Sequence, residues 1–154
     1  MYKTVRRKDR ELSSCLAAKL FSECEYGILC TADMNGQAYG TPLNYVYKDN
    51  FVYFHCAVEG HKLENIKANK KVSFCVVGRT KILPDKFATQ YESAIAFGSA
   101  SEVYGSEKQD ALLSLLEKYS SGFLEEGKKY IDKMGERTRV IRINIEHLTG
   151  KARE

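Results

Sequence analysis

The sequence predicts a β-rich α+β domain in which about six mainly antiparallel strands form a small barrel with short helices at its flanks. Two observations lead to this class. Runs of β-prone residues follow one another through tight turns, which is typical of an antiparallel meander. Segments with a helical hydrophobic period stand before, between and after these runs.

Length and composition limit the alternatives. The chain has 154 residues, of which 44% are hydrophobic and 29% are charged, so we expect one globular domain over residues 1–154. No apolar run is long enough to cross a bilayer, and the N-terminus lacks the apolar segment of a secretory signal. A formal net charge of only +4 argues against a nucleic-acid-binding module. Five cysteines without a signal peptide predict reduced thiols and a cytoplasmic location.

Six runs have the composition or alternation of strands: 26–33, 37–48, 51–57, 72–83, 91–105 and 138–148. Asn35-Gly36 predicts a two-residue hairpin turn, because both positions tolerate positive φ, and Asp49-Asn50 predicts the next turn. Pro42 marks a sheet edge or a bulge, since proline cannot donate to a ladder. Gly98 indicates a bulge or a close approach of backbones. The last run places alternate isoleucines on its inner face: Ile141, Ile143 and Ile145.

Four segments are expected as helices: 9–23, 62–71, 106–119 and 123–134. In the first, Asp9 is the expected N-cap. Its expected buried face consists of residues at helical spacing: Leu12, Cys15, Leu16 and Leu20. Ser106 and Gln109 match a capping box at the start of the third segment, whose apolar face has Leu112, Leu115, Leu116 and Tyr119.

Residues 40–71 are the most informative stretch for function. Thr41 and Asn44 lie on one predicted strand, His55 and Cys56 end the next, and Gly60-His61-Lys62 begins a helix. A phosphate is bound by backbone N–H donors, the positive end of a helix dipole and a mobile cation, which this arrangement supplies. Gly60 would allow the backbone to approach the anion closely.

Two other chemistries are possible for the same residues. His55, Cys56 and His61 are of the types that bind zinc or iron, and Cys56 with His55 could form a nucleophilic dyad. Neighbouring residues of a strand point to opposite faces, however, which argues against both arrangements. We therefore expect no metal site and no catalytic side chain.

Four segments together resemble a known family: YGILCTADMNGQAYGTPLNYVY, FVYFHCAVEGHKLENIKANKKVSFCVV, SAIAFGSASEV and INIEHLTGKA. They are similar to the FMN-binding split-barrel superfamily of pyridoxamine 5′-phosphate oxidases, over about Leu12 to Lys151. His61 stands where the oxidases have an arginine, which gives up the bidentate fork and makes the charge pH-dependent. The chain also has no Trp, and the oxidases' C-terminal substrate-binding pattern has no counterpart. The resemblance therefore favours the nitroimidazole-resistance (Nim-type) branch.

The resemblance implies a six-stranded antiparallel split β-barrel (Greek key) and a homodimer with one FMN in each of two clefts at the subunit interface. Gly40–Tyr45 would follow the isoalloxazine and ribityl chain, and His61 with Lys62 would hold the phosphate. The cofactor-binding residues expected on this basis are Thr41, Pro42, Leu43, Asn44, Tyr45, His55, Cys56, Ala57, Gly60, His61, Lys62 and Ser93.

The implied function is that of an FMN-dependent oxidoreductase that reduces a small acceptor such as a nitroaromatic, with any NAD(P)H binding transiently at the flavin. Three alternatives remain at this point. The first is a non-enzymatic protein that stores or senses FMN. The second is a haem protein with His55 or His61 as axial ligand. The third, nucleic-acid binding through residues 3–10 and 67–71, is disfavoured by the modest charge, and no membrane partner is expected.

Overall fold

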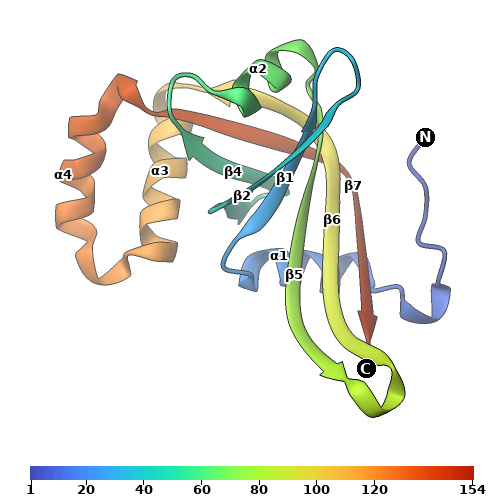
Figure 1. Ribbon diagram of the computed structural model, residues 1–154. Helices are drawn as coiled ribbons and strands as arrows, with labels where there is room; N and C mark the ends of the chain where they lie inside the picture. Colours follow the sequence, from blue (N-terminus) through green and yellow to red (C-terminus); the bar gives the residue numbers. More distant parts are fainter.

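The computed structural model describes residues 1–154 and contains one antiparallel sheet of seven strands (Figure 1). The strands are β1 (Gly27–Ala32), β2 (Ala38–Leu43), β3 (Val46–Lys48), β4 (Phe51–Cys56), β5 (Lys71–Leu83), β6 (Ala88–Val103) and β7 (Arg139–Arg153). Their order across the sheet is β2-β1-β5-β6-β7-β4-β3. The β-rich α+β class is confirmed, whereas the expected count of six strands is one too few.

The additional strand arises because residues 37–48, expected as one strand, form two. Between β2 and β3 the backbone of Tyr45 pairs with a side chain and not with a neighbouring strand. Its N–H donates to the Tyr119 hydroxyl oxygen at 3.0 Å, and that hydroxyl donates to the Tyr45 carbonyl oxygen, also at 3.0 Å. The sheet ladder is therefore interrupted at Tyr45, where a residue from a distant helix satisfies both backbone groups.

The sheet curves but does not close into a hydrogen-bonded barrel (Figure 1). The two ends of the strand order, β2 and β3, remain edges, so the prediction of a barrel is wrong as far as closure of the sheet is concerned. Pro42 lies in edge strand β2, as predicted, where a residue without an N–H costs no ladder bond. Beyond the body of the domain, β5 and β6 continue as a long hairpin arm (Figure 1).

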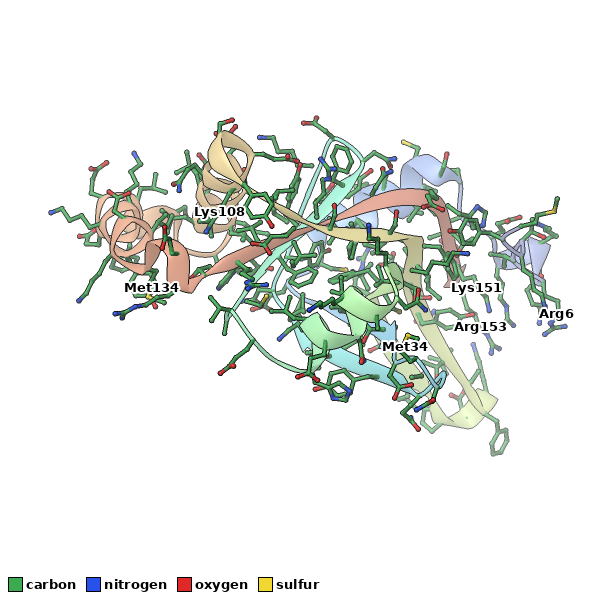
Figure 2. The ribbon with its side chains drawn as sticks, turned by 90° about the horizontal axis from the view of Figure 1, so that it is seen from above. Arg6, Met34, Lys108, Met134, Lys151 and Arg153 are labelled. Carbon is green, nitrogen blue, oxygen red and sulfur yellow. The ribbon has the colours of Figure 1, made fainter.

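Four α-helices cover parts of the sheet: α1 (Ser14–Glu23), α2 (His61–Ala68), α3 (Gly105–Tyr119) and α4 (Leu124–Met134). Short 3-10 helices stand at Lys8–Arg10, Pro84–Lys86, Ser121–Phe123 and Gly135–Arg137. Helices α3 and α4 lie side by side at one end of the molecule, and the two chain termini lie toward the other (Figure 1). The view from above agrees, with Met134 and Arg6 at opposite ends (Figure 2). No helix is long and apolar enough to cross a membrane.

Helix α1 begins later and buries another face than expected. Its N-cap is Ser13, whose hydroxyl accepts from the Leu16 N–H at 3.2 Å, and not Asp9. Leu16 is 50% exposed and Cys15 is exposed, so the predicted apolar face is wrong at these two positions, whereas Leu20 is buried as predicted. The buried residues are Ala17, Leu20 and Phe21. Their spacing is equally helical, and Ala17 is small enough to pack where α1 crosses Gly150 of β7.

The first hairpin turn also differs from the prediction. Asp33–Gln37 form the connection, with the Asp33 carboxylate accepting from the N–H of Asn35 at 2.8 Å and of Gln37 at 2.9 Å. Only Gly36 has positive φ there, at 82°. The two-residue turn with two positive φ angles is instead the second predicted turn, at Asp49 (52°) and Asn50 (66°).

The start of α3 does not use the predicted capping box, because no side chain caps its N-terminus. Glu107 is engaged elsewhere. Its carboxylate accepts from the Tyr53 hydroxyl at 2.9 Å and from the Arg142 guanidinium at 2.8 Å. Glu107, which lies between the two residues of the predicted capping box, therefore ties α3 to strands β4 and β7.

The main core lies between the curved sheet and α1, and a smaller core lies under α3. The predicted inner face of β7 is confirmed, since Ile141, Ile143 and Ile145 are 2%, 0% and 7% exposed. Gly98 is confirmed as a close approach. A Cβ at that position would lie 1.9 Å from the Asn144 carbonyl oxygen, beside a register shift between Phe97 and Gly98.

Candidate functional site

The segment that joins β4 to α2 has the geometry of an anion site. Gly60 has a φ of +145°, a conformation that residues with a side chain rarely adopt. No heavy atom lies within 4 Å of where a Cβ would stand, so the space beside Gly60 is open. No side chain caps the N-terminus of α2. The first turn of this helix therefore retains backbone N–H groups that are free to donate hydrogen bonds to an anion.

His61 and Lys62 stand at the first two positions of α2. The His61 ring stacks on Tyr39 of β2, with 3.9 Å between ring centroids and 25° between planes. Lys62 belongs to none of the ion pairs in the structure, whereas the neighbouring Arg139 pairs with Glu102 at 3.5 Å. The positive charge of Lys62 is therefore not neutralised within the chain.

Thr41 lies two residues beyond Tyr39 on β2 and so on the same face of the strand. Its hydroxyl oxygen is buried and has no hydrogen-bond partner. Buried polar atoms without a partner are uncommon, and each requires an explanation. One explanation is a ligand group that completes the bond. Of the adjacent predicted residues, Pro42 is exposed, and Leu43 packs against the main core.

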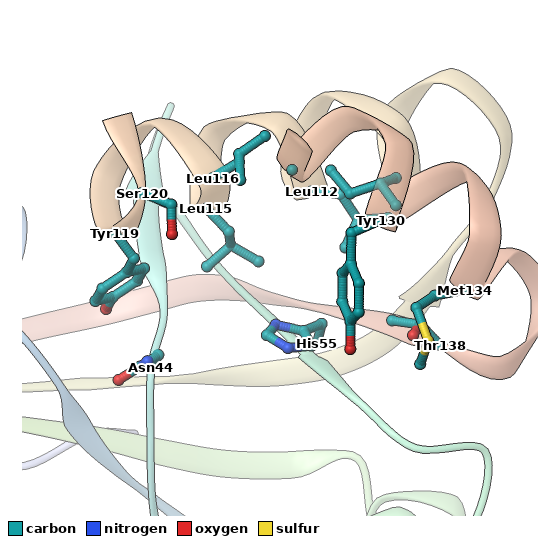
Figure 3. A pocket seen from close by; sticks show the side chains of 12 residues that line it. Asn44, His55, Leu112, Leu115, Leu116, Tyr119, Ser120, Tyr130, Met134 and Thr138 are labelled. Atoms are coloured by element: carbon teal, nitrogen blue, oxygen red, sulfur yellow. The ribbon is translucent and has the colours of Figure 1, made fainter. Parts of the chain in front are cut away.

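Asn44 and His55 come together at the other side of this region. Both line a cavity of about 230 Å³ beneath α3 and α4 (Figure 3). His55 is exposed overall, but the protein around its imidazole partly desolvates the ring and lowers its pKa below the ordinary value, which favours the neutral form. No charged group contributes to this shift.

Tyr45 has a structural position. Its side chain is 0% exposed, and its hydroxyl donates to the Phe21 carbonyl oxygen. Phe54 is likewise fully buried. Neither side chain has surface in this chain with which to line a cofactor cleft. Only the backbone at Tyr45 can border one.

Cys56 points away from His55, as strand alternation predicts. Cys56 lies in the main core, while His55 faces the cavity below α3 and α4. Burial raises the pKa of the Cys56 thiol, and the charges of Lys62 and Arg139 oppose that shift. The two residues form no nucleophilic dyad, because the thiol and the imidazole are on opposite faces of β4. No group of three or more His, Cys, Asp or Glu side chains is placed to hold a metal ion.

Two further predicted residues differ in their placement. Ala57 is exposed directly after β4, between His55 and Gly60. Ser93 pairs with Val77 and Lys151 near the hairpin arm. Ser101 of the same strand lines a groove with Gly60, and it lies roughly 26 Å farther along β6 at 3.3 Å per residue. One chain therefore does not bring Ser93 to the groove beside Gly60.

Sequence reasoning missed the contribution of α3 and α4 to this region. Leu112, Leu115 and Tyr119 were expected as a packing face, and they do pack, but they also form one wall of the cavity. Tyr130 and Met134 of α4 form another. The spacing of a packing face and of a cavity wall is the same, so the pattern contained no signal that distinguishes them.

The sequence model of the pyridoxamine 5′-phosphate oxidase family matches residues 17–152. The chain belongs to this family. The match covers the whole sheet up to Ala152 and every predicted site residue. No curated protein sequence matches the chain.

Solved structures of similar shape support this assignment of the pyridoxamine 5′-phosphate oxidase fold. A conserved hypothetical protein from Mycobacterium tuberculosis is 21% identical, with a TM-score of 0.80 over 97% of this chain and 90% of that chain. A protein from Bacteroides thetaiotaomicron, provisionally named as a 5-nitroimidazole antibiotic resistance protein, is 19% identical, with a TM-score of 0.72 over 92% and 85%. An FAD and haem binding protein from Mycobacterium smegmatis is 14% identical, with a TM-score of 0.78 over 94% and 74%.

Proposed function

We propose that the protein binds FMN and uses it to reduce a small acceptor such as a nitroaromatic. The observation that carries this proposal is the uncapped N-terminus of α2, which begins with His61 and Lys62 directly after Gly60. The FMN phosphate is an anion that matches these groups. Family membership and the FAD and haem binding protein of similar fold support a flavin over other phosphorylated ligands.

The residues present fit such a cofactor. Gly60 has open space beside it, and Lys62 has no ion-pair partner to release. The Thr41 hydroxyl has no hydrogen-bond partner and would bind a hydroxyl of the ribityl chain. Thr41 lies on the same face of β2 as Tyr39, on which the His61 ring stacks. The exposed surfaces of Pro42, Asn44 and Ala57 then remain for the ring system.

The flavin would supply the transfer of hydride or single electrons. The side chains of this protein would bind and orient it. Lys62 would balance the phosphate charge, and His55 would stay neutral because burial lowers its pKa. The Cys56 thiol would stay protonated because burial raises its pKa. No side chain is required as a nucleophile, and any NAD(P)H would bind transiently at the flavin. An FMN-storing or FMN-sensing protein would share these features and differ only in lacking turnover.

A second copy of the chain is part of the proposal. Ser93 lies far along β6 from Ser101, which shares a groove with Gly60, and a second subunit could bring a Ser93 side chain to the phosphate end of the cofactor. A homodimer with two clefts at its interface would provide this arrangement. We also propose a cytoplasmic location, since the five cysteines of the chain are all free thiols.

The test compares FMN with riboflavin, which lacks the phosphate. Wild-type protein should quench the fluorescence of FMN at lower concentrations than that of riboflavin. His61→Ala with Lys62→Ala should lose this preference while still binding riboflavin. Lys129→Ala with Lys133→Ala, which removes two exposed lysines of α4 that do not line the groove with Gly60, is the matched control and should keep the preference. Equal affinity of the wild type for FMN and riboflavin would refute the phosphate site.

Haem is the second candidate cofactor, because a protein of similar fold binds both FAD and haem. His61 is exposed at the start of α2 and would be the axial ligand. Addition of hemin should then produce a sharp Soret band that His61→Ala abolishes. A spectrum identical to that of free hemin excludes this candidate.

A further inference from the structure

A cavity of about 230 Å³ lies between α3, α4 and strand β4, and the anion site at α2 does not include it (Figure 3). Helix α3 forms one wall and α4 another, while His55 and Asn44 lie on the strand side. Gly127 allows the two helices to touch at one point, since a Cβ there would lie 2.1 Å from Leu116 Cδ1. Tyr130 is 63% exposed, so the cavity has a rim at the surface.

The lining of the cavity contains no charge. Twelve residues form it, and none is Asp, Glu, Lys or Arg, although 29% of the chain is charged. Seven of the twelve are hydrophobic. A charged ligand would lose its hydration here without gaining a partner, so the cavity discriminates against ions.

Three aromatic side chains line the cavity. His55, Tyr119 and Tyr130 come from three different elements and border the same space (Figure 3). Ring faces at different orientations bind a planar aromatic ligand by stacked and edge-to-face contacts. The Tyr119 hydroxyl is already committed to the carbonyl oxygens of Glu25 and Tyr45, at 2.5 and 3.0 Å. The polar groups that remain to hydrogen-bond a ligand are those of Asn44, His55, Ser120, Tyr130 and Thr138.

The size of the cavity sets the size of the ligand. A dry cavity of about 150 Å³ holds one benzene molecule. The present cavity, about 230 Å³, therefore has room for a substituted single ring or for a fused pair of small rings. It is below the roughly 300–1,000 Å³ of pockets for drug-sized ligands.

We propose that this cavity is a binding site for a small, neutral aromatic molecule that carries one hydrogen-bonding group. The cavity borders the proposed flavin site, because Asn44 and His55 belong to both, but its uncharged lining suits a ligand other than the flavin. Burial favours the neutral form of the His55 imidazole, which can accept a hydrogen bond from a ligand N–H or O–H.

The test uses indole and flavin-free protein, with NMR of the histidine ring protons as the readout. The chain has three histidines, His55, His61 and His147, and only His55 lines the cavity. Indole should shift the His55 resonance saturably, with a Kd of about 1 mM or tighter, and leave the other two unchanged. Each resonance is assigned by replacing one histidine at a time.

Two tryptophan variants on α4 distinguish cavity binding from surface binding. Ile131→Trp places a large ring in the cavity and should weaken indole binding by at least about tenfold. Lys133→Trp places the same ring on the exposed side of the same helix and should bind as the wild type does. The proposal is overturned if no saturable His55 shift appears, if all three histidines shift alike, or if Ile131→Trp binds as tightly as Lys133→Trp. The FMN–riboflavin comparison can fail without affecting any of these outcomes.

Discussion

The Lys118 ammonium lies 3.9 Å from the centroid of the Tyr45 ring and donates a 2.9 Å hydrogen bond to the Tyr45 carbonyl oxygen. The same ammonium donates to the Cys24 carbonyl oxygen at 2.9 Å. One side chain of α3 therefore holds the end of α1 and the junction of β2 with β3, next to Asn44. This contact fixes the backbone on which the Asn44 side of the candidate site is built.

Lys118→Met should reduce the free energy of unfolding by about 1–3 kcal/mol, because the Cys24 carbonyl oxygen loses a hydrogen bond, the Tyr45 carbonyl oxygen keeps only that from Tyr119, and the cation–π contact disappears. Urea denaturation measures the change. Lys19→Met, on the exposed side of α1, is the control and should change stability by less than about 0.5 kcal/mol. Equal effects of the two substitutions would mean that the contacts of Lys118 contribute no stability.

Gly98→Ala should be strongly destabilising, since the new Cβ would lie 1.9 Å from a backbone oxygen of β7 that cannot move independently. We expect a loss of about 3 kcal/mol, or roughly 6–12 °C in Tm for a domain of this size. Gly122→Ala is the matched control, because no atom lies within 4 Å of the position that its Cβ would take. Differential scanning calorimetry measures the Tm of both variants. Equal Tm values would mean that the backbones of β6 and β7 do not approach closely at Gly98.

His55 should titrate below the ordinary histidine value, because burial lowers its pKa in the folded protein. The unfolded chain takes up this proton at about pH 6.5, before the folded state does. Stability should therefore fall as pH drops below that value, and it should stop falling once the folded-state pKa is passed. An NMR titration of the His55 ring protons measures the folded value directly. A midpoint at or above the ordinary value would contradict this desolvation of the imidazole.

The five cysteines should react unequally with a thiol reagent in the native protein. Cys15 is exposed and should react first, whereas Cys24 and Cys56 are buried and burial raises the pKa of both thiols. Cys15→Ser should remove the fast phase of labelling with Ellman's reagent. Rapid labelling of Cys56, identified by peptide mass, would show that the thiol is reactive and would reopen a role for it.

Local patterns predicted the strands well, because alternation and turn residues are properties of neighbouring positions. Ile141, Ile143, Pro42 and Gly98 all have the roles that their local sequence indicates. The face of α1 could not be chosen in this way. Two sets of apolar residues fit one helical period, and the choice depends on Ala17 packing at Gly150, which is distant in sequence.

The candidate site was predictable in part for the same reason. Gly60, His61 and Lys62 are consecutive, so their position at a helix start follows from the sequence alone. The burial of Tyr45 depends on Lys118 and Tyr119, more than 70 residues away. Alternation along a strand cannot reveal such a partner.

The measurement that tests the central claim most directly is a titration of the flavin-free protein with FMN, followed by absorbance and fluorescence. The proposal predicts a yellow complex that saturates at one FMN per chain with a dissociation constant in the micromolar range or below. A protein that remains colourless and leaves FMN fluorescence unchanged at micromolar concentrations would contradict it.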